Sequence, residues 1–318
     1  MNKVVIPVYN YRGMMLDGAA NILRENGFEV ELLESEKPVT QEKLLEMCKD
    51  AYGICCGPEK YPAELLKQCP NLKIIMKYGV GVDNIDIDAC KELGITVGKC
   101  ANNIPVAEHA VMLMLASLKQ VKKFDRIIRN GGWDRANVYE LTGRTVGIIG
   151  FGNIGRRVAE MIGGFDVKIL AYDPYPNQAE ADRLHATYVD LEYLLKNSDI
   201  ISLHMPGTTD GTYLIGKEQL DMMKDNVVLI NTARGSLINQ KDLCDALDSG
   251  KIYAAGLDVF EKEPTGNDNP LFKYDNVIVT PHVASGTLET HTKMGVTCAE
   301  GIIAYSKGEK LQYPVLQY

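Results

Sequence analysis

The sequence predicts an α/β protein built on two doubly wound parallel sheets. Short apolar runs rich in β-branched residues alternate with helix-period segments along nearly all of the 318 residues, which is typical of parallel strands covered by helices. One run, 145–149, leads into three spaced glycines, and the next apolar run closes on Asp173. Strand, glycines, helix, strand and terminal carboxylate together indicate a βαβ unit that binds a dinucleotide.

The first hundred residues contain five predicted strands that alternate with helices. The strands are expected at 4–8, 29–33, 51–56, 73–78 and 95–99, and the helices include 14–26, 41–48 and 63–68. The segment 8–13 after the first strand has one glycine where a dinucleotide fingerprint needs three. We therefore expect a separate domain with another task.

A long helical segment, 106–129, is expected to link the halves, with Pro105 well placed in its first turn. The nucleotide unit begins at Arg144. About six strands are expected in it, and those after the first lie at 167–172, 199–204, 227–231, 253–259 and 277–280. A last helix at 288–306 crosses back to the first domain. We predict a substrate domain of residues 1–101 plus 286–318 and a Rossmann domain of residues 102–285.

Composition narrows the class of partner. The net charge of −8 and the lack of a basic cluster argue against nucleic acid. No run approaches the ~20 apolar residues of a membrane span, so no membrane partner is expected. The eight cysteines form no CxxC pair and have no histidine at metal-ligand spacing, so we expect reduced thiols and no metal. A cytoplasmic protein that binds small molecules is predicted.

The fingerprint is Gly150-Phe-Gly152-Asn153-Ile154-Gly155. Its glycines permit a tight turn, close approach of backbone N–H groups to a pyrophosphate and close packing of the following helix on the sheet. Asp173 is expected to accept hydrogen bonds from a ribose diol and to repel a 2′-phosphate, and 174–182 contains no Lys or Arg to receive one. NAD is therefore the expected cofactor.

Three polar side chains, Arg234, Glu263 and His282, follow predicted strands at the edge where such sheets bind ligands. Imidazole suits the proton transfer that accompanies hydride transfer from a hydroxyl, and a nearby carboxylate would orient it. A guanidinium grips a carboxylate in a planar fork. The set predicts a dehydrogenase of 2-hydroxy acids, although Arg234 alone fits a surface salt bridge and Glu263 a solvated charge.

The other histidines have different expected roles. His204, with Pro206 beside it, is expected in the wall of the cofactor pocket. His109 fits a capping or helix-surface role as well as any other, and His185 and His291 stand in polar, exposed context. His282 is therefore the preferred acid/base.

The chain resembles the D-isomer-specific 2-hydroxyacid dehydrogenases along nearly its whole length. The matching segments are 78–86, 106–109, 147–156, 204–206, 231–235, 256–264 and 280–282. The resemblance implies that His282 is the general acid/base and Glu263 its orienting partner. It implies that Arg234 binds the substrate carboxylate and polarises the reacting carbonyl, helped by the backbone N–H groups of Val80 and Gly81.

The resemblance also implies the rest of the cofactor site and the assembly. Asp258 is expected near the carboxamide of the nicotinamide, Thr232 and Ala233 along its ring, and Ile154 against the pyrophosphate. The Rossmann domain is then inserted in a flavodoxin-like substrate domain, and the protein is expected to be a homodimer.

Within the family the chain looks most like the catalytic part of D-3-phosphoglycerate dehydrogenases. Lys77 and Arg135 are similar to positions used there for the substrate phosphate, although both equally fit solvated charges. Bulky Tyr78 stands beside the substrate loop in place of a usually small residue, which disfavours a phosphorylated acid as substrate. Glycerate or hydroxypyruvate, glyoxylate and longer branched acids remain open.

Two other functions compete with this prediction. One is an NAD-sensing, corepressor-like scaffold, since the family includes corepressors that retain the three polar residues. The other is a relative of formate or phosphite dehydrogenases. The complete Arg, Glu and His set, together with the loop 78–81, favours an enzyme that acts on a 2-hydroxy acid.

Overall fold

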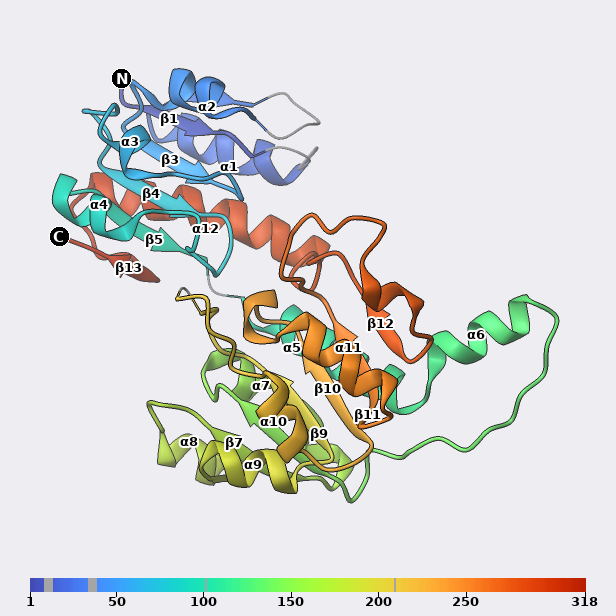
Figure 1. The fold of residues 1–318 in the computed structure, drawn as a ribbon. Helices are drawn as coiled ribbons and strands as arrows, with labels where there is room; N and C mark the ends of the chain where they lie inside the picture. The colour runs from blue at the N-terminus through green and yellow to red at the C-terminus, as the bar shows by residue number, and fades with distance from the viewer. Residues whose placement is uncertain (9–13, 34–38, 101, 209) are drawn as a thin grey trace. The chain divides into compact units, whose positions relative to one another are not determined.

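The computed structural model describes residues 1–8, 14–33, 39–100, 102–208 and 210–318. They form two compact units, one of Met1–Asn102 with Gly286–Tyr318 and one of Asn103–Ser285 (Figure 1). Each unit has one sheet with helices on both faces, so the predicted α/β class is confirmed. Most of the segment 8–13, in which the sequence lacks a glycine fingerprint, lies outside the described residues.

The sheet of the first unit has the strand order β13-β5-β4-β3-β1-β2. Its strands are β1 (Lys3–Ile6), β2 (Glu29–Leu32), β3 (Gly53–Cys56), β4 (Ile74–Lys77), β5 (Thr96–Lys99) and β13 (Pro314–Leu316). The first five are parallel in the flavodoxin-like order. Strand β13 pairs antiparallel with β5 and was not predicted, because its residues Pro314–Leu316 form no run of β-branched side chains.

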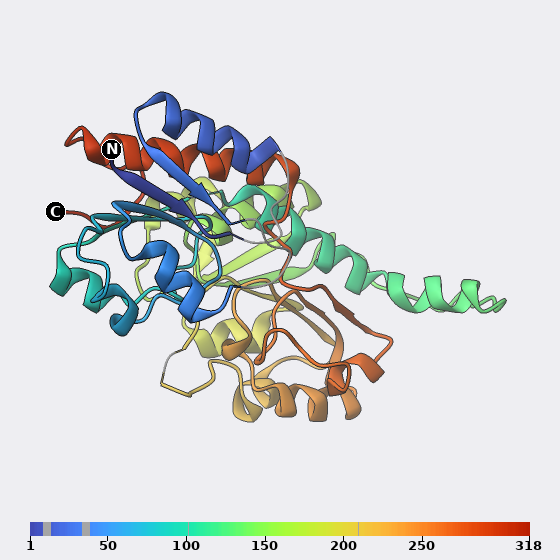
Figure 2. The same ribbon diagram turned by 90° about the horizontal axis from the view of Figure 1, so that it is seen from above.

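Helices cover both faces of this sheet. On one face α1 (Met14–Glu25) and α12 (Leu288–Ser306) lie side by side, the blue and red helices of Figure 2. On the other lie α2 (Gln41–Cys48), α3 (Ala63–Leu66) and α4 (Ile87–Leu93). Helix α12 begins where the sequence predicts, because Thr287 accepts a hydrogen bond from the Thr290 backbone and caps its N-terminus.

The second unit has a seven-stranded parallel sheet in the order β12-β11-β10-β9-β6-β7-β8. Its strands are β6 (Thr145–Ile149), β7 (Lys168–Tyr172), β8 (Ala186–Tyr188), β9 (Ile200–Leu203), β10 (Val227–Asn231), β11 (Ile252–Leu257) and β12 (Val277–Val279). This is the Rossmann order with one further edge strand. The sequence predicted about six strands and missed β8, whose three residues form the opposite edge.

Helices α5 (Ile104–Leu118) and α7 (Asn153–Ile162) pack on one face of this sheet. The other face carries α9 (Leu191–Asn197), α10 (Lys217–Met222) and α11 (Gln240–Asp248), while α8 (Gln178–Arg183) packs beside β8. The continuous helix predicted over 106–129 is wrong. Gln120 adopts a left-handed conformation (φ 50°), which separates α5 from α6 (Val121–Arg129).

Helix α6 projects away from the sheet of the second unit in both views (Figures 1 and 2). None of its nine residues is buried. Within the described part of the chain, no helix combines the length and apolar character that crossing a membrane requires.

Candidate active site

Each glycine of the fingerprint meets a different physical demand. Gly150 has φ 93°, and a Cβ there would lie 2.6 Å from the His204 carbonyl carbon. A Cβ on Gly155 would lie 2.1 Å from the Gly150 carbonyl oxygen. At Gly152 a Cβ would meet no atom of the described residues within 4 Å. The first and third glycines thus serve the fold, and the second leaves open space where a cofactor phosphate can approach the backbone.

The N-terminus of α7 is free to bind an anion. Gly152 occupies the N-cap position and has no side chain to satisfy the first N–H groups, which include those of Asn153 and Ile154. Helix α7 has ten residues, and the positive end of its dipole lies at this N-terminus. Both features fit the pyrophosphate of NAD.

Asp173 lies at the end of β7, next to the fingerprint. Its Oδ2 accepts a hydrogen bond from the Phe151 backbone N–H at 2.8 Å, and its Oδ1 accepts one from the Tyr175 N–H at 2.8 Å. These bonds hold the carboxylate against the glycine loop, the position in which the sequence predicts a ribose ligand.

Two buried polar atoms at the ends of neighbouring strands lack partners among the described residues. They are Nδ1 of His204, after β9, and Oγ1 of Thr232, after β10. Burial lowers the pKa of His204 to about 3, so its ring is neutral at physiological pH, and Ser202 Oγ lies 2.9 Å from Nε2. Since buried polar atoms are normally hydrogen-bonded, this pair fits a polar cofactor in the pocket. Pro206 lies exposed just beyond.

The turn after β10 is held by a residue whose role the sequence did not reveal. Buried Asn231 accepts a hydrogen bond from the Ala233 N–H at 3.0 Å and donates one to the Arg234 carbonyl at 2.9 Å. Arg234 in turn donates from Nη1 to the Ala233 carbonyl at 2.7 Å. Asn231 therefore fixes the backbone that presents Thr232, Ala233 and Arg234.

His282 and Glu263 form a hydrogen-bonded pair. Nδ1 of His282 lies 2.6 Å from Glu263 Oε2, and their side chains are 47% and 34% exposed. Burial raises the pKa of Glu263, but hydrogen bonds from His282 and the Phe260 N–H and the charges of His282 and Arg234 outweigh it, so the pKa is lowered. Glu263 is thus ionised near neutrality, and Arg234 lies close enough to influence it.

Asp258 organises the segment that carries His282. The carboxylate is fully buried and accepts hydrogen bonds from Thr280 Oγ1 at 2.5 Å, from the Val283 N–H at 2.9 Å and from the Ala284 N–H at 2.9 Å. Its carbonyl accepts the His282 N–H at 2.7 Å. These bonds sustain a left-handed conformation at His282 (φ 51°), which a residue with a Cβ rarely adopts.

His109, for which the sequence left several roles open, belongs to the same network. Its Nε2 lies 3.0 Å from Thr280 Oγ1 and 3.6 Å from Asp258 Oδ1. The sequence signal was present, because His109 and Thr280 both lie in segments that resemble the family, but 171 residues separate them.

In the first unit, Lys77 and Tyr78 are buried at the end of β4. Nζ of Lys77 donates to the Gly57 carbonyl at 2.5 Å and to Asn84 Oδ1 at 2.8 Å. The hydroxyl of Tyr78 donates to the His291 carbonyl at 2.8 Å, and the two rings are stacked. The expected exposure of His291 is therefore wrong: it is half-buried, and burial lowers its pKa.

The remaining predicted substrate residues are accessible. Val80 and Gly81 are half-exposed in the loop after β4. Arg135 is exposed in the second unit, in the irregular segment after α6. Within the described residues no group of three or more His, Cys, Asp or Glu side chains is placed to hold a metal ion.

Residues 111–284 match the model of the D-isomer specific 2-hydroxyacid dehydrogenase NAD binding domain. The chain belongs to the D-isomer specific 2-hydroxyacid dehydrogenases. The family predicted from the sequence is thereby confirmed, and so is NAD as cofactor. This dehydrogenase is an oxidoreductase that acts on CH–OH donors, and the comparisons favour that function over the corepressor-like and formate or phosphite dehydrogenase alternatives.

Relatives of the dehydrogenase differ in length. The D-3-phosphoglycerate dehydrogenase of Archaeoglobus fulgidus is 41% identical over 91% of this chain, which spans 55% of that protein. The hydroxypyruvate reductase of Thermotoga maritima is 42% identical, with 90% of this chain and 94% of that protein covered. The solved glyoxylate reductase of Paecilomyes thermophila is 30% identical with a TM-score of 0.89, and covers 99% of this chain and 98% of its own.

Proposed function

We propose that this chain interconverts a small, unphosphorylated D-2-hydroxy acid of the glycerate or glycolate class and its 2-oxo acid. The observation that carries the reaction type is the His282–Glu263 pair at 2.6 Å, with Arg234 acting on the same carboxylate. The choice of an unphosphorylated acid is supported by Lys77. Its buried ammonium already donates hydrogen bonds to the Gly57 carbonyl and to Asn84 Oδ1, so it is engaged within the fold. This choice is also supported by relatives that this chain covers over more than nine tenths of their length and that are named for hydroxypyruvate and glyoxylate.

Each residue then has a defined part in the reaction. NAD, when bound, supplies the hydride acceptor, or the donor in reverse. Because Nδ1 of His282 is engaged by Glu263, Nε2 exchanges the proton with the substrate oxygen. Ionised Glu263 stabilises the imidazolium. Arg234 grips the substrate carboxylate.

The loop after β4 has a complementary part. We propose that the backbone N–H groups of Val80 and Gly81 contribute to the binding of the substrate carboxylate. Asp258, Thr232 and Ala233 are the residues proposed to hold the nicotinamide end of the cofactor.

A panel of 2-oxo acids tests the substrate. NADH oxidation by the purified protein is measured with hydroxypyruvate, its 3-phosphate, glyoxylate, pyruvate and branched longer acids. We expect kcat/KM for hydroxypyruvate or glyoxylate to exceed that for the phosphate ester by at least about tenfold. The phosphate group of the ester would lack a strong contact to the protein, and one such contact is worth about that factor. A preference for the phosphate ester would contradict the proposal. Lys77 and Arg135 would then again be candidates for binding the substrate phosphate.

Asp173→Ala tests the predicted ribose contact. Removal of the carboxylate takes away both the hydrogen-bond acceptor for the diol and the repulsion of a 2′-phosphate. We expect the NADH to NADPH preference in kcat/KM to fall about tenfold or more. A variant whose preference is undiminished would show that another residue binds the ribose.

We further propose a cytoplasmic homodimer without nucleic-acid or membrane partners. The acidic net charge of −8 supports the absence of a nucleic-acid partner, and the free thiols of the eight cysteines support a reducing location. Dimerisation is supported by the projecting α6 and the segment after it, which expose Ile128 and Trp133. Sedimentation velocity that returns the mass of one chain would contradict the dimer.

A further inference from the structure

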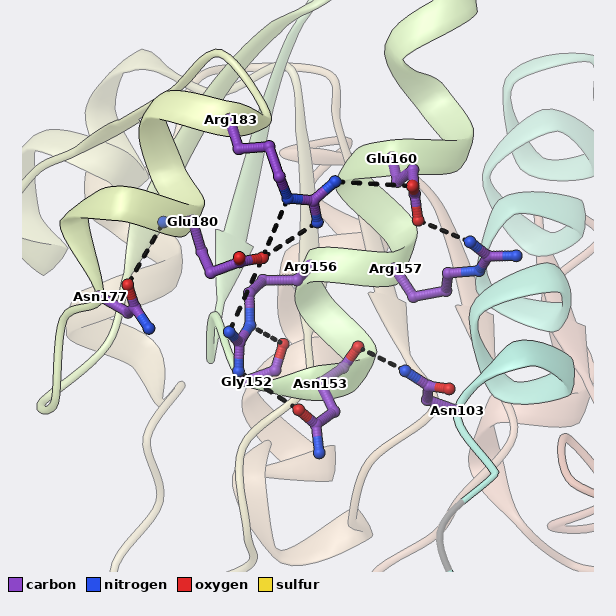
Figure 3. A network of polar contacts seen from close by, with 9 residues as sticks. All are labelled: Asn103, Gly152, Asn153, Arg156, Arg157, Glu160, Asn177, Glu180 and Arg183. Carbon is purple, nitrogen blue, oxygen red and sulfur yellow. Dashed lines mark hydrogen bonds and ion pairs between the residues drawn. The ribbon is translucent and has the colours of Figure 1, made fainter.

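The surface beside the fingerprint carries an ionic network that the sequence did not predict (Figure 3). It consists of Arg156, Arg157 and Glu160 from α7 and of Glu180 and Arg183 from α8. These side chains line an open cavity next to the N-terminus of α7. Although the segment 174–182 lacks basic residues, Arg183 directly follows it at the end of α8, and the fold places Arg156 of α7 beside Glu180 of α8.

Arg156 borders the loop that Asp173 also contacts. Its Nε donates to the Gly152 carbonyl at 3.1 Å, and its Nη2 donates to Asn153 Oδ1 at 3.2 Å. Asp173 accepts a hydrogen bond from the N–H of Phe151, the residue before Gly152. A negative and a positive group thus contact successive residues of the loop on which the cofactor is proposed to lie.

Glu180 is the anion shared by the two arginines. Its Oε2 accepts hydrogen bonds from Nε and Nη2 of Arg183, at 3.2 and 2.9 Å, and lies 3.8 Å from Nη1 of Arg156. The hydrogen bond from Arg183 is the main reason that the pKa of Glu180 is lowered. Glu160, which pairs with Arg157, lies 3.6 Å from the remaining Nη1 of Arg183.

We propose that Glu180 is a second determinant of cofactor choice, which keeps Arg156 and Arg183 from binding the 2′-phosphate of NADPH. Guanidinium groups bind phosphate in strong, charge-assisted hydrogen bonds, so unpaired arginines here would attract NADPH. With Glu180 in place, the 2′-phosphate would have to displace the Glu180 carboxylate from the arginines. It would also be repelled by the negative charge of that carboxylate. This inference rests on the proposed binding of the cofactor at the fingerprint, and Asp173 supplies the first determinant.

Glu180→Gln tests the proposal through binding alone. The purified full chain is titrated with NADPH and separately with NADH, with nicotinamide fluorescence as the readout and no substrate present. We expect the affinity for NADPH to rise about tenfold and that for NADH to stay within about twofold, because NADH has no group that would use the released arginines. Since turnover is not measured, a wrong substrate assignment does not affect the result, whereas failure to bind NADH would refute the cofactor site itself.

Two further variants make the test specific. Glu192→Gln is the matched control, because Glu192 also forms an exposed pair, with Lys196 on α9 of the same unit, and its loss changes the net charge equally. We expect it to leave both affinities unchanged. Adding Arg156→Gln and Arg183→Gln to Glu180→Gln is expected to abolish the gain. The proposal is overturned if Glu180→Gln gains no affinity for NADPH, if Glu192→Gln gains as much, or if the gain survives without both arginines.

Discussion

His282→Asn is expected to lower kcat by at least about 10²-fold while NADH still binds with nearly unchanged affinity. General acid/base catalysis contributes a factor of this size, and an amide has no proton that it can exchange near neutrality. Asparagine is chosen because it tolerates the left-handed conformation of this position (φ 51°) better than alanine. The measurements are steady-state turnover on the preferred 2-oxo acid and a fluorescence titration with NADH.

The chain contains a matched control for this substitution. His185 also has φ 51°, is exposed and lies in the same unit, so His185→Asn makes the same chemical change in the same backbone conformation. We expect it to leave kcat within about twofold, as is usual for surface substitutions. Comparable losses in the two variants, or full activity in His282→Asn, would remove the acid/base role from His282.

The fold was predictable because buried parallel strands leave a local signal. Strands such as β6 and β10 are covered on both faces and therefore read as continuous β-branched runs. The short edge strands β8 (Ala-Thr-Tyr) and β13 (Pro-Val-Leu) contain no such run, whereas β12, equally short and also at an edge, is a Val-Ile-Val run and was predicted. The break at Gln120 was missed because no Gly or Pro stands there, and a left-handed conformation of glutamine has no sequence signal.

The candidate site was predictable as far as its residues follow strands. Glu263 and His282 were paired from their positions at strand ends, and the structure brings them together. The supporting contacts were not predictable in the same way, because His109 and Thr280 meet across 171 residues. Asn231 fixes the turn through side-chain hydrogen bonds to the backbone. Many short polar residues can form such bonds, so the sequence does not single out Asn231 for this role.

Charge placement shows the same limit more sharply. The absence of Lys and Arg from 174–182 predicts that no cation receives a 2′-phosphate there. Arg183 lies one residue beyond that segment, in the same helix α8, and Arg156 of α7 reaches Glu180 only through the packing of the fold. A preference for NAD therefore depends on which carboxylates pair with these arginines, as well as on Asp173.

Gly152→Val is expected to weaken NADH binding by about 10²-fold with at most a small decrease in the melting temperature, since valine is a poorer N-cap than glycine. A Cβ at Gly152 meets no atom of the described residues within 4 Å, so the first atom of a side chain fits there without a clash. The proposed pyrophosphate needs that same space, and the loss of its hydrogen bonds to the backbone N–H groups, worth about 1.5–3 kcal/mol each, corresponds to a factor of about 10² for one or two bonds. A fluorescence titration with NADH measures the first effect, and thermal unfolding without cofactor measures the second.

Gly155→Val separates the two demands on the fingerprint. Its Cβ would lie 2.1 Å from the Gly150 carbonyl oxygen, so α7 must move away from β6. We expect a lower melting temperature as well as weaker NADH binding, because backbone atoms cannot yield as a flexible side chain can. Gly163→Ala, at a site with open space and helical φ of −56°, is expected to leave NADH binding unchanged and not to lower the melting temperature, because alanine at such a position is neutral or stabilising. If Gly152→Val bound NADH normally, the cofactor would have to lie away from this loop, and the roles proposed for Asp173 and Glu180 would fall with it.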